Sequence, residues 1–91
     1  MRVRSCSWFE LVTGALIRAG FTTDGRPPAV GYLVYRWTRK GAAGLAVIEI
    51  HGNRTLRKVL PDGRIYVHKH CSVEDAVGII GSAAIDADFP S

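Results

Sequence analysis

Apolar positions along the chain change from helical spacing to strand spacing and back again. Residues 7–20 place apolar side chains about every three to four positions, which is typical of a helix that packs by one face. Ser7 and Glu10 have the spacing of a capping box, and Gly20 stands where a left-handed residue commonly ends a helix. The pattern therefore predicts a first helix over residues 7–20.

The middle of the chain is rich in β-branched and aromatic residues and is broken by turn signals. Gly52-Asn53 predicts a two-residue hairpin, and Pro61-Asp62-Gly63 predicts a type I turn with the glycine in the left-handed position. Together these signals predict a strand region over residues 30–70. Its four strands cover 30–38, 45–51, 54–60 and 64–70, with a flexible basic connection over 39–44.

A second helix is predicted over residues 72–84, with Ser72 and Asp75 as its capping box. Residues 85–91 are predicted to form an acidic tail. Short connections favour antiparallel neighbours, so the strands should form a meander in chain order. The chain of 91 residues is thus predicted to be one α+β domain: helix, four-stranded antiparallel meander, helix, with both helices packed on one face of the sheet.

Alternation along the strands assigns side chains to the two faces of the sheet. The face under the helices is predicted to carry Leu33, Tyr35, Trp37, Ala46, Ile48, Ile50, Leu56, Leu60, Ile65 and Val67. The open face is predicted to carry Tyr32, Val34, Arg36, Val47, Glu49, His51, Arg57, Val59, Tyr66, His68 and His70. Lys58 and Lys69 fall on the apolar side, which predicts a sheet edge or a bulge near them.

Charge is distributed unevenly along the chain. All 12 Lys and Arg residues precede residue 70, and the net charge is +4. Residues 71–91 contain half of the 8 acidic residues and no Lys or Arg. A basic sheet beside an acidic segment indicates an anionic partner, or an acidic tail that folds over the sheet.

The open face is the leading candidate for function. Tyrosine rings can stack on bases and guanidinium groups can bind phosphates, which is what single-stranded nucleic acid requires. The expected function is non-enzymatic binding of a nucleic acid or of an anionic nucleoprotein surface. The predicted contact residues are Tyr32, Arg36, Arg39, Lys40, His51, Arg54, Arg57, Tyr66, His68 and His70.

A protein partner is the alternative. The second helix would present a smooth patch made of Glu74, Asp75, Gly78 and Gly81, which suits a partner's backbone or a second copy of the chain. A compact domain without a catalytic motif also suits a small inhibitor or adaptor of the kind that mobile elements or phages use. A homodimer through this helix or through a sheet edge belongs to the same hypothesis.

Catalysis and cofactor binding have little support in the sequence. Glu49, His51, His68 and His70 would form a metal site or an acid–base pair only if the second and fourth strands were adjacent, and the predicted meander separates them. A small nuclease that uses the histidines is a third hypothesis. We expect no catalytic residue, no metal and no cofactor.

The remaining features predict an ordinary cytoplasmic protein. No apolar stretch is long enough to cross a membrane, and Glu10 and Arg18 interrupt the only stretch that follows a basic start. Cys6 and Cys71 are therefore expected to be free, inert thiols.

Two families have a similar order of elements. Double-stranded RNA-binding domains resemble the chain in this order, but their second helix begins with lysines, whereas residues 71–75 here are acidic. Small HicA-type RNase toxins are similar over residues 16–21 and 61–64, but their Gly-Ser-His motif is replaced by Gly31-Tyr32-Leu33. The sequence is assigned to neither family.

Overall fold

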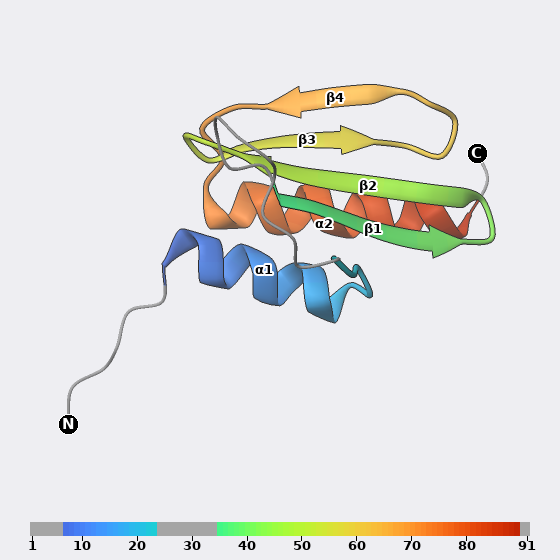
Figure 1. Cartoon of the computed structure of the whole chain (residues 1–91), viewed down its shortest axis with the longest axis horizontal. Helices are drawn as coiled ribbons and strands as arrows, with labels where there is room; N and C mark the ends of the chain where they lie inside the picture. The colour runs from blue at the N-terminus through green and yellow to red at the C-terminus, as the bar shows by residue number, and fades with distance from the viewer. Residues whose placement is uncertain (1–6, 24–34, 90–91) are drawn as a thin grey trace.

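The computed structural model describes residues 7–23 and 35–89, and the predictions for Tyr32, Leu33 and Val34 lie outside these residues. The four strands form one antiparallel sheet in the order β1-β2-β3-β4, with one helix before it and one after it. This confirms the predicted α+β meander (Figure 1). The elements are α1 (Trp8–Arg18), β1 (Tyr35–Gly41), β2 (Gly44–His51), β3 (Thr55–Val59), β4 (Ile65–His68) and α2 (Val73–Asp88).

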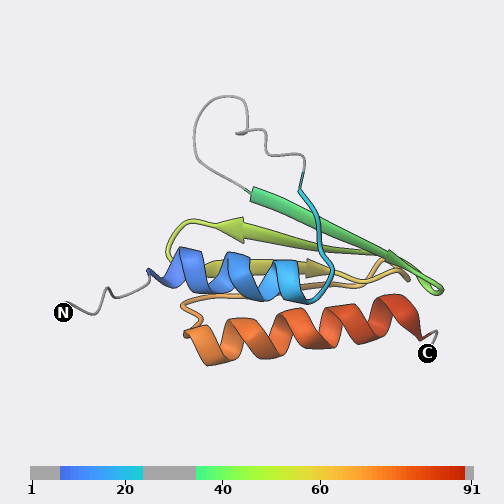
Figure 2. The ribbon, with the colours of Figure 1, turned by 90° about the horizontal axis from the view of Figure 1, so that it is seen from below.

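Both helices lie on the same side of the sheet (Figure 2). α2 packs against β1, β2 and β3, and α1 packs beside α2 near the β1 edge, so β4 lies at the far edge (Figure 1). The hydrophobic core contains residues from both helices and from β1, β2 and β3, and none from β4. Its buried members are Val12, Ala15, Leu16, Phe21, Trp37, Ala46, Ile48, Ile50, Leu56, Cys71, Ala76, Ile80, Ala83 and Ala87.

The predicted capping box is complete at the start of α2, and at the start of α1 only its Ser7 half is formed. Ser7 accepts a hydrogen bond from Glu10 N at 3.1 Å, which satisfies a free N–H group at the start of α1. At the start of α2, the Ser72 hydroxyl accepts from Asp75 N and the Asp75 carboxylate accepts from Ser72 N, which completes the capping box. Gly20 has a φ of 87° and ends α1, and the following Phe21 is buried.

α2 is longer than predicted. Residues 85–88, which we expected in an acidic tail, form its last turn. The cause is a contact with the β1–β2 hairpin. The Arg39 guanidinium donates to Ala84 O at 2.9 Å and binds the Asp88 carboxylate at 2.9 Å, and Ala43 N donates to Ala87 O at 2.8 Å. Ala43 N thus satisfies the Ala87 carbonyl, which would otherwise be free at the helix end, and Arg39 adds a bond to Ala84 O and an ion pair with Asp88.

β1 also extends beyond its predicted end. It continues through Arg39 and Lys40 to Gly41 instead of giving way to a flexible connection, and the hairpin turns at Ala42-Ala43. Gly41 lies against α2 so closely that a Cβ atom there would overlap the carbonyl of Ala87. The packing of this hairpin on the end of α2 explains both extensions.

The β2–β3 loop contains three residues, Gly52, Asn53 and Arg54, where we predicted two. Asn53 and Arg54 adopt left-handed conformations, with φ of 57° and 55°. The extra residue makes Ile50 face Leu56, and this pairing keeps both side chains in the core, as their spacing predicted.

The predicted faces of β4 are wrong. Val59 faces Ile65 and Arg57 faces Val67, so Ile65 and Val67 lie on the open face, and Tyr66 and His68 lie on the helix side. The turn sets this register. Leu60 N donates to Arg64 O at 2.9 Å, so the three-residue loop 61–63 closes between these two residues. The chain then continues with Ile65 on the same side as Val59.

No bulge displaces β3, contrary to one expectation for Lys58. Lys58 faces Ile48 on the helix side, and its ammonium lies 5.1 Å from the centre of the Tyr66 ring. The position is only partly buried, because the helices are displaced toward β1. The position of Lys58 near the edge of the sheet, which was the other prediction from the sequence, explains why a lysine is tolerated on the helix side.

Candidate binding surface

The centre of the open face holds a charge cluster. Arg57 Nη1 and His51 Nε2 each lie 3.0 Å from Glu49 Oε1. All three side chains were predicted on this face, and the β2–β3 register brings them together. Arg57 and His51 are therefore already bound to a carboxylate.

Glu49 is held in its ionised form. Partial burial acts to raise its pKa, but the hydrogen bonds from His51 and Arg57 and the charge of Arg57 outweigh burial, so the pKa lies below its ordinary value of 4.5. A phosphate would have to compete with this ionised carboxylate for Arg57.

The other predicted cations are scattered. Arg36 and Lys40 are exposed on β1, and Arg54 lies in the β2–β3 loop. None of these three forms an ion pair with a side chain that the structure describes. Arg39 faces Ala46 on the helix side and is bound to α2, so its predicted place in a basic turn is wrong.

His68 and Tyr66 do not join the open face, because the β4 register turns them to the helix side. His68 lies in a hollow with Lys69, Cys71, Asp75 and Ile79, and its Nε2 atom is buried without a partner among the described residues. His70 lies beyond the end of β4, exposed, with a left-handed φ of 55°.

The predicted candidates for metal binding are thus separated. Glu49 and His51 lie on one face of the sheet, and His68 lies on the other. Within residues 7–23 and 35–89, no three His, Cys, Asp or Glu side chains are grouped as metal ligands.

The two edges of the sheet differ. Along β1, Thr22 and Thr38 exchange backbone hydrogen bonds of 2.9 and 2.8 Å, and the Thr23 hydroxyl donates to Arg36 O. These contacts cover much of the β1 edge. Along β4, no described segment pairs with the outer edge.

The hydrogen-bonding pattern between β3 and β4 determines which backbone N–H and C=O groups are exposed at the β4 edge. Because Leu60 and Arg64 form a hydrogen-bonded pair, the alternation of an antiparallel ladder directs the backbone groups of Tyr66 and His68 toward β3. The N–H and C=O groups of Ile65 and Val67 point away from the sheet. The apolar pattern of β4 did not indicate this edge, although the turn at Pro61-Asp62-Gly63 that fixes it was predicted.

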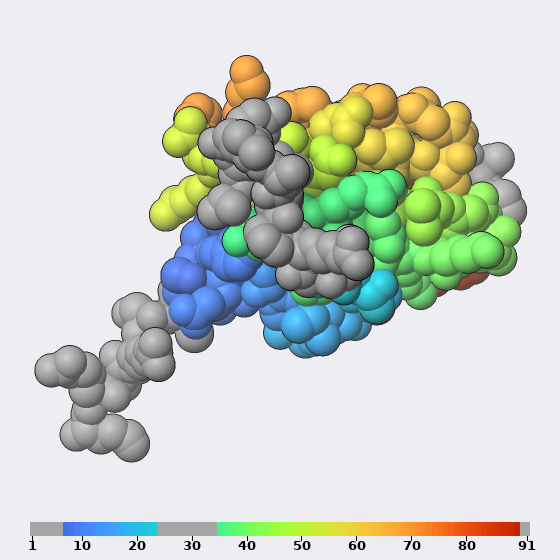
Figure 3. All heavy atoms as spheres, viewed as in Figure 1, coloured from blue at the N-terminus to red at the C-terminus, as the bar shows by residue number. Residues whose placement is uncertain are grey.

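The side chains of β4 are exposed on both faces. Ile65 is 50% exposed and Val67 is 54% exposed on the open face, and Tyr66 is 39% exposed on the other. Figure 3 shows β4, in orange, along the margin of the open face. We call these three side chains, with the outward backbone groups of Ile65 and Val67, the β4 surface.

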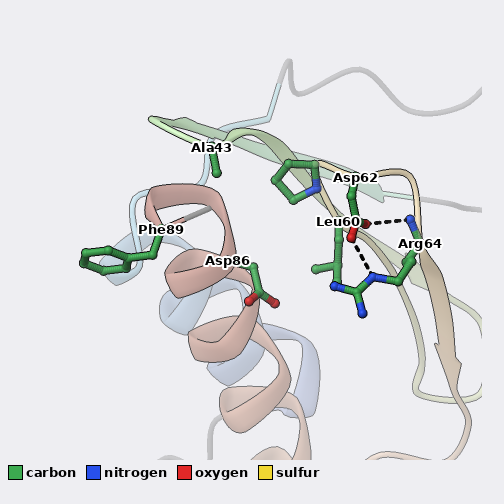
Figure 4. Close-up of a pocket in the computed structure, with 7 residues that line it drawn as sticks. Ala43, Leu60, Asp62, Arg64, Asp86 and Phe89 are labelled. Atoms are coloured by element: carbon green, nitrogen blue, oxygen red, sulfur yellow. Dashed lines mark hydrogen bonds and ion pairs between the residues drawn. The ribbon is translucent and has the colours of Figure 1, made fainter. Parts of the chain in front are cut away.

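A pocket of about 180 Å³ lies between the β3–β4 turn and the end of α2. In Figure 4, the Arg64 guanidinium, held by Asp62, faces Asp86 across the pocket, and the Phe89 ring points away. A hydrogen bond from the Arg64 backbone and contacts with its side chain keep the pKa of Asp62 below its ordinary value. The pocket is small, and its lining combines acidic and basic side chains with the apolar Leu60.

The helix patch predicted for a protein partner lies on α2. Glu74 and Gly78 are exposed on α2, and nothing lies near a Cβ atom added at Gly78 or Gly81. Asp75 is also exposed, and its carboxylate completes the capping box and lines the hollow beside His68. Exposed Val77 and Ile85 accompany the glycines.

Cys71 is a buried free thiol that forms hydrogen bonds with residues of β4 and α1. Its Sγ donates to His68 O at 3.3 Å, and its carbonyl accepts from Trp8 Nε1 at 2.9 Å. Burial and the charge of Asp75 raise the thiol pKa, which opposes formation of a nucleophilic thiolate. Cys6 lies outside the described residues.

Comparison with known proteins identifies no relative, because no family model, curated protein or solved structure matches the chain. Neither α1 nor α2 is long and apolar enough to cross a lipid bilayer.

Proposed function

We propose that the protein is a small, non-enzymatic inhibitor or adaptor that binds a protein partner through the β4 surface. The observation that carries the proposal is the exposure of Ile65 and Val67 on a strand that contributes nothing to the core. Binding is proposed here because the exposed strand offers a surface for a partner, whereas His51 and Arg57 are both held by Glu49.

The composition of β4 supports this choice. Ile-Tyr-Val is typical of a buried strand, and the pattern predicted that Ile65 and Val67 would be in the core. Both side chains are instead about half exposed, next to Val59 on the same face. Burying the exposed part of each against a partner would contribute about 1 kcal/mol. An apolar strand at an open margin is a common feature of protein interaction sites.

Nucleic-acid binding is the second candidate, and a separate observation favours it. Arg54 and Lys69 are exposed and have no ion-pair partner among the described side chains. They belong to the same end of the sheet, where Cys71 N donates to Arg54 O at 2.9 Å. An anionic backbone would find cations there. The loss of Tyr66 from the open face removes one of the rings proposed for base stacking.

Site-specific photocrosslinking in the cells that naturally make the protein tests the proposal. A photoreactive phenylalanine analogue is placed at Val67 in one protein and at Ile17 in the control. Ile17 is also apolar and exposed, but it lies on α1, away from β4. We expect a discrete adduct from position 67 that protease degrades and nuclease does not.

Three results would contradict the proposal. Equal adducts from positions 67 and 17 would indicate non-specific contact, and no adduct would indicate that β4 has no partner. An adduct that nuclease degrades would favour the second candidate. Nucleic-acid binding predicts in addition that oligonucleotide affinity falls steeply as salt rises.

A further inference from the structure

We infer that the partner binds by adding an extended segment to the free edge of β4, and that acidic residues flank this segment. The inference rests on the proposed function and specifies the mode of binding and the chemistry of the partner. Three observations lead to it: the free backbone groups, the alternating side chains and the cations at both ends of the strand.

The backbone of β4 is ready to pair. Ile65 and Val67 present outward N–H and C=O groups, and a strand placed beside them would form ladder hydrogen bonds. Natural sheets protect such an edge with very short strands, proline, an inward charge or a bulge. β4 is short, with four residues, but it contains no proline and no bulge, and its ladder with β3 is regular from Val59↔Ile65 to Leu56↔His68.

The other edge provides the contrast. β1 is covered at Thr38 by Thr22, and the Arg36 carbonyl accepts from Thr23. Within the described part of the chain, the β1 edge is therefore protected at Arg36 and Thr38, whereas no segment pairs with the outer edge of β4. An open edge that is also apolar favours strand addition over contact through side chains alone.

Side chains along β4 indicate what the added segment should carry. Successive residues of a strand alternate between faces, so one set of its side chains would meet Ile65 and Val67. That set should be apolar or β-branched. The other set would lie beside Tyr66 and His68, on the side where Lys58 contacts the tyrosine ring.

Charge selects the partner. Arg64 precedes β4, and Lys69 and His70 follow it, all exposed. Asp62 binds Arg64, but Lys69 forms no ion pair with any described side chain. In an antiparallel pair of two β4 strands, Arg64 of one copy would lie near residues 68–70 of the other. Like charges opposite each other destabilise a sheet, so a segment with acidic ends fits better than a second copy.

A labelled peptide in which valine and threonine alternate, with two glutamates at each end, serves as the probe. A peptide with lysines in place of the glutamates is its control. We expect the first peptide to bind the full chain at least about tenfold more tightly than the second, and to lose affinity as salt rises. On binding, the amide hydrogens of Ile65 and Val67 should become protected from exchange.

Two variants separate the mode of binding from the surface. Val67→Pro removes an outward N–H group and leaves the ladder bonds with β3 in place. It should reduce peptide affinity at least about tenfold while the circular dichroism spectrum stays that of the parent. Val67→Thr keeps the N–H group and is the matched control for folding and for backbone pairing, so it should lose less affinity than Val67→Pro.

Each other outcome overturns the inference in a distinguishable way. If Ile65→Thr/Val67→Thr abolishes binding but Val67→Pro does not, β4 is the binding surface and strand addition is wrong. If no variant changes binding, the proposed function fails as well. Equal binding of both peptides, or no binding of either, contradicts the acidic segment. A dimer mass in light scattering that Val67→Pro reduces to a monomer would identify a second copy as the occupant.

Discussion

Arg57 and Val67 lie directly opposite each other on β3 and β4, on the face of the sheet that neither α1 nor α2 covers. A valine that resembles a core residue in the sequence thus shares an open surface with an arginine. The same register places Ile65 opposite Val59. The open face was predicted to carry tyrosine, arginine and histidine side chains. It instead carries the Glu49–His51–Arg57 charge cluster, with the apolar residues of β4 beside it.

The first prediction concerns the stability of β4. Ile65→Thr/Val67→Thr should change the free energy of unfolding by no more than about 0.5 kcal/mol for each residue, because both side chains are half exposed and threonine suits a strand. Urea denaturation measures this change. The matched control is Ile48→Thr, in a fully buried position of the same sheet, which should cost at least about 2 kcal/mol. A loss of that size from the β4 double variant would show that Ile65 and Val67 are buried.

A second prediction concerns the end of α2. Arg39→Ala should lower the free energy of unfolding by about 1–2 kcal/mol, because it removes charge-assisted hydrogen bonds to Ala84 O and to the Asp88 carboxylate. The last turn of α2 should also lose amide protection, which hydrogen exchange measures residue by residue.

Asp88→Asn is the control for Arg39→Ala. It weakens the ion pair but keeps the bond from Arg39 to Ala84 O, so its cost should be the smaller of the two. If both variants lower the free energy of unfolding equally, the ion pair alone stabilises the helix end. If neither variant lowers it, the hairpin does not stabilise α2.

Two glycines should respond in opposite directions to alanine. Gly41→Ala places a Cβ atom against the carbonyl of Ala87 and should destabilise the protein by about 1–3 kcal/mol, because backbone must move. Gly78→Ala adds a Cβ atom in open space on a helix and should stabilise by about 0.5–1 kcal/mol. Thermal denaturation of both variants measures this. Similar effects of the same sign would contradict the packing of the hairpin on α2.

Acid should weaken the charge cluster on the open face. The pKa of Glu49 is below 4.5 in the folded protein, so its contribution to stability is present above pH 4.5 and is lost as the pH falls through the folded pKa. Glu49→Gln should be less stable than the parent at neutral pH. The difference between the two proteins should shrink below pH 4.5. A difference that is independent of pH would show that the carboxylate charge is not responsible.

Local signals in the sequence were sufficient to predict where the helices begin and the order of the strands in the sheet. The capping residues Ser7 and Ser72, the end of α1 at Gly20 and the meander order are all confirmed. These features depend on neighbouring residues or on short connections, and their physical causes lie within a few positions of the chain. Alternation also placed Leu56 correctly in the core, despite the error in the length of the preceding loop.

Features set by distant contacts could not be predicted in the same way. α2 continues to Asp88 because Arg39, far away in the sequence, binds its end. The prediction for β4 failed because it followed the apolar character of Ile65 and Val67 and ignored the register set by the turn at Pro61. An exposed apolar strand violates the usual relation between pattern and burial, and such violations are expected where a protein binds a partner.

Amide hydrogen exchange of the free protein, followed by NMR, tests the central claim about β4 most directly. We expect the N–H groups of Ile65 and Val67 to exchange at least about tenfold faster than those of Tyr66 and His68, which bond to β3. Slow exchange at all four positions would contradict the claim of a free edge. Faster exchange at Tyr66 and His68 than at Ile65 and Val67 would show that the register of β4 is the reverse of the one described.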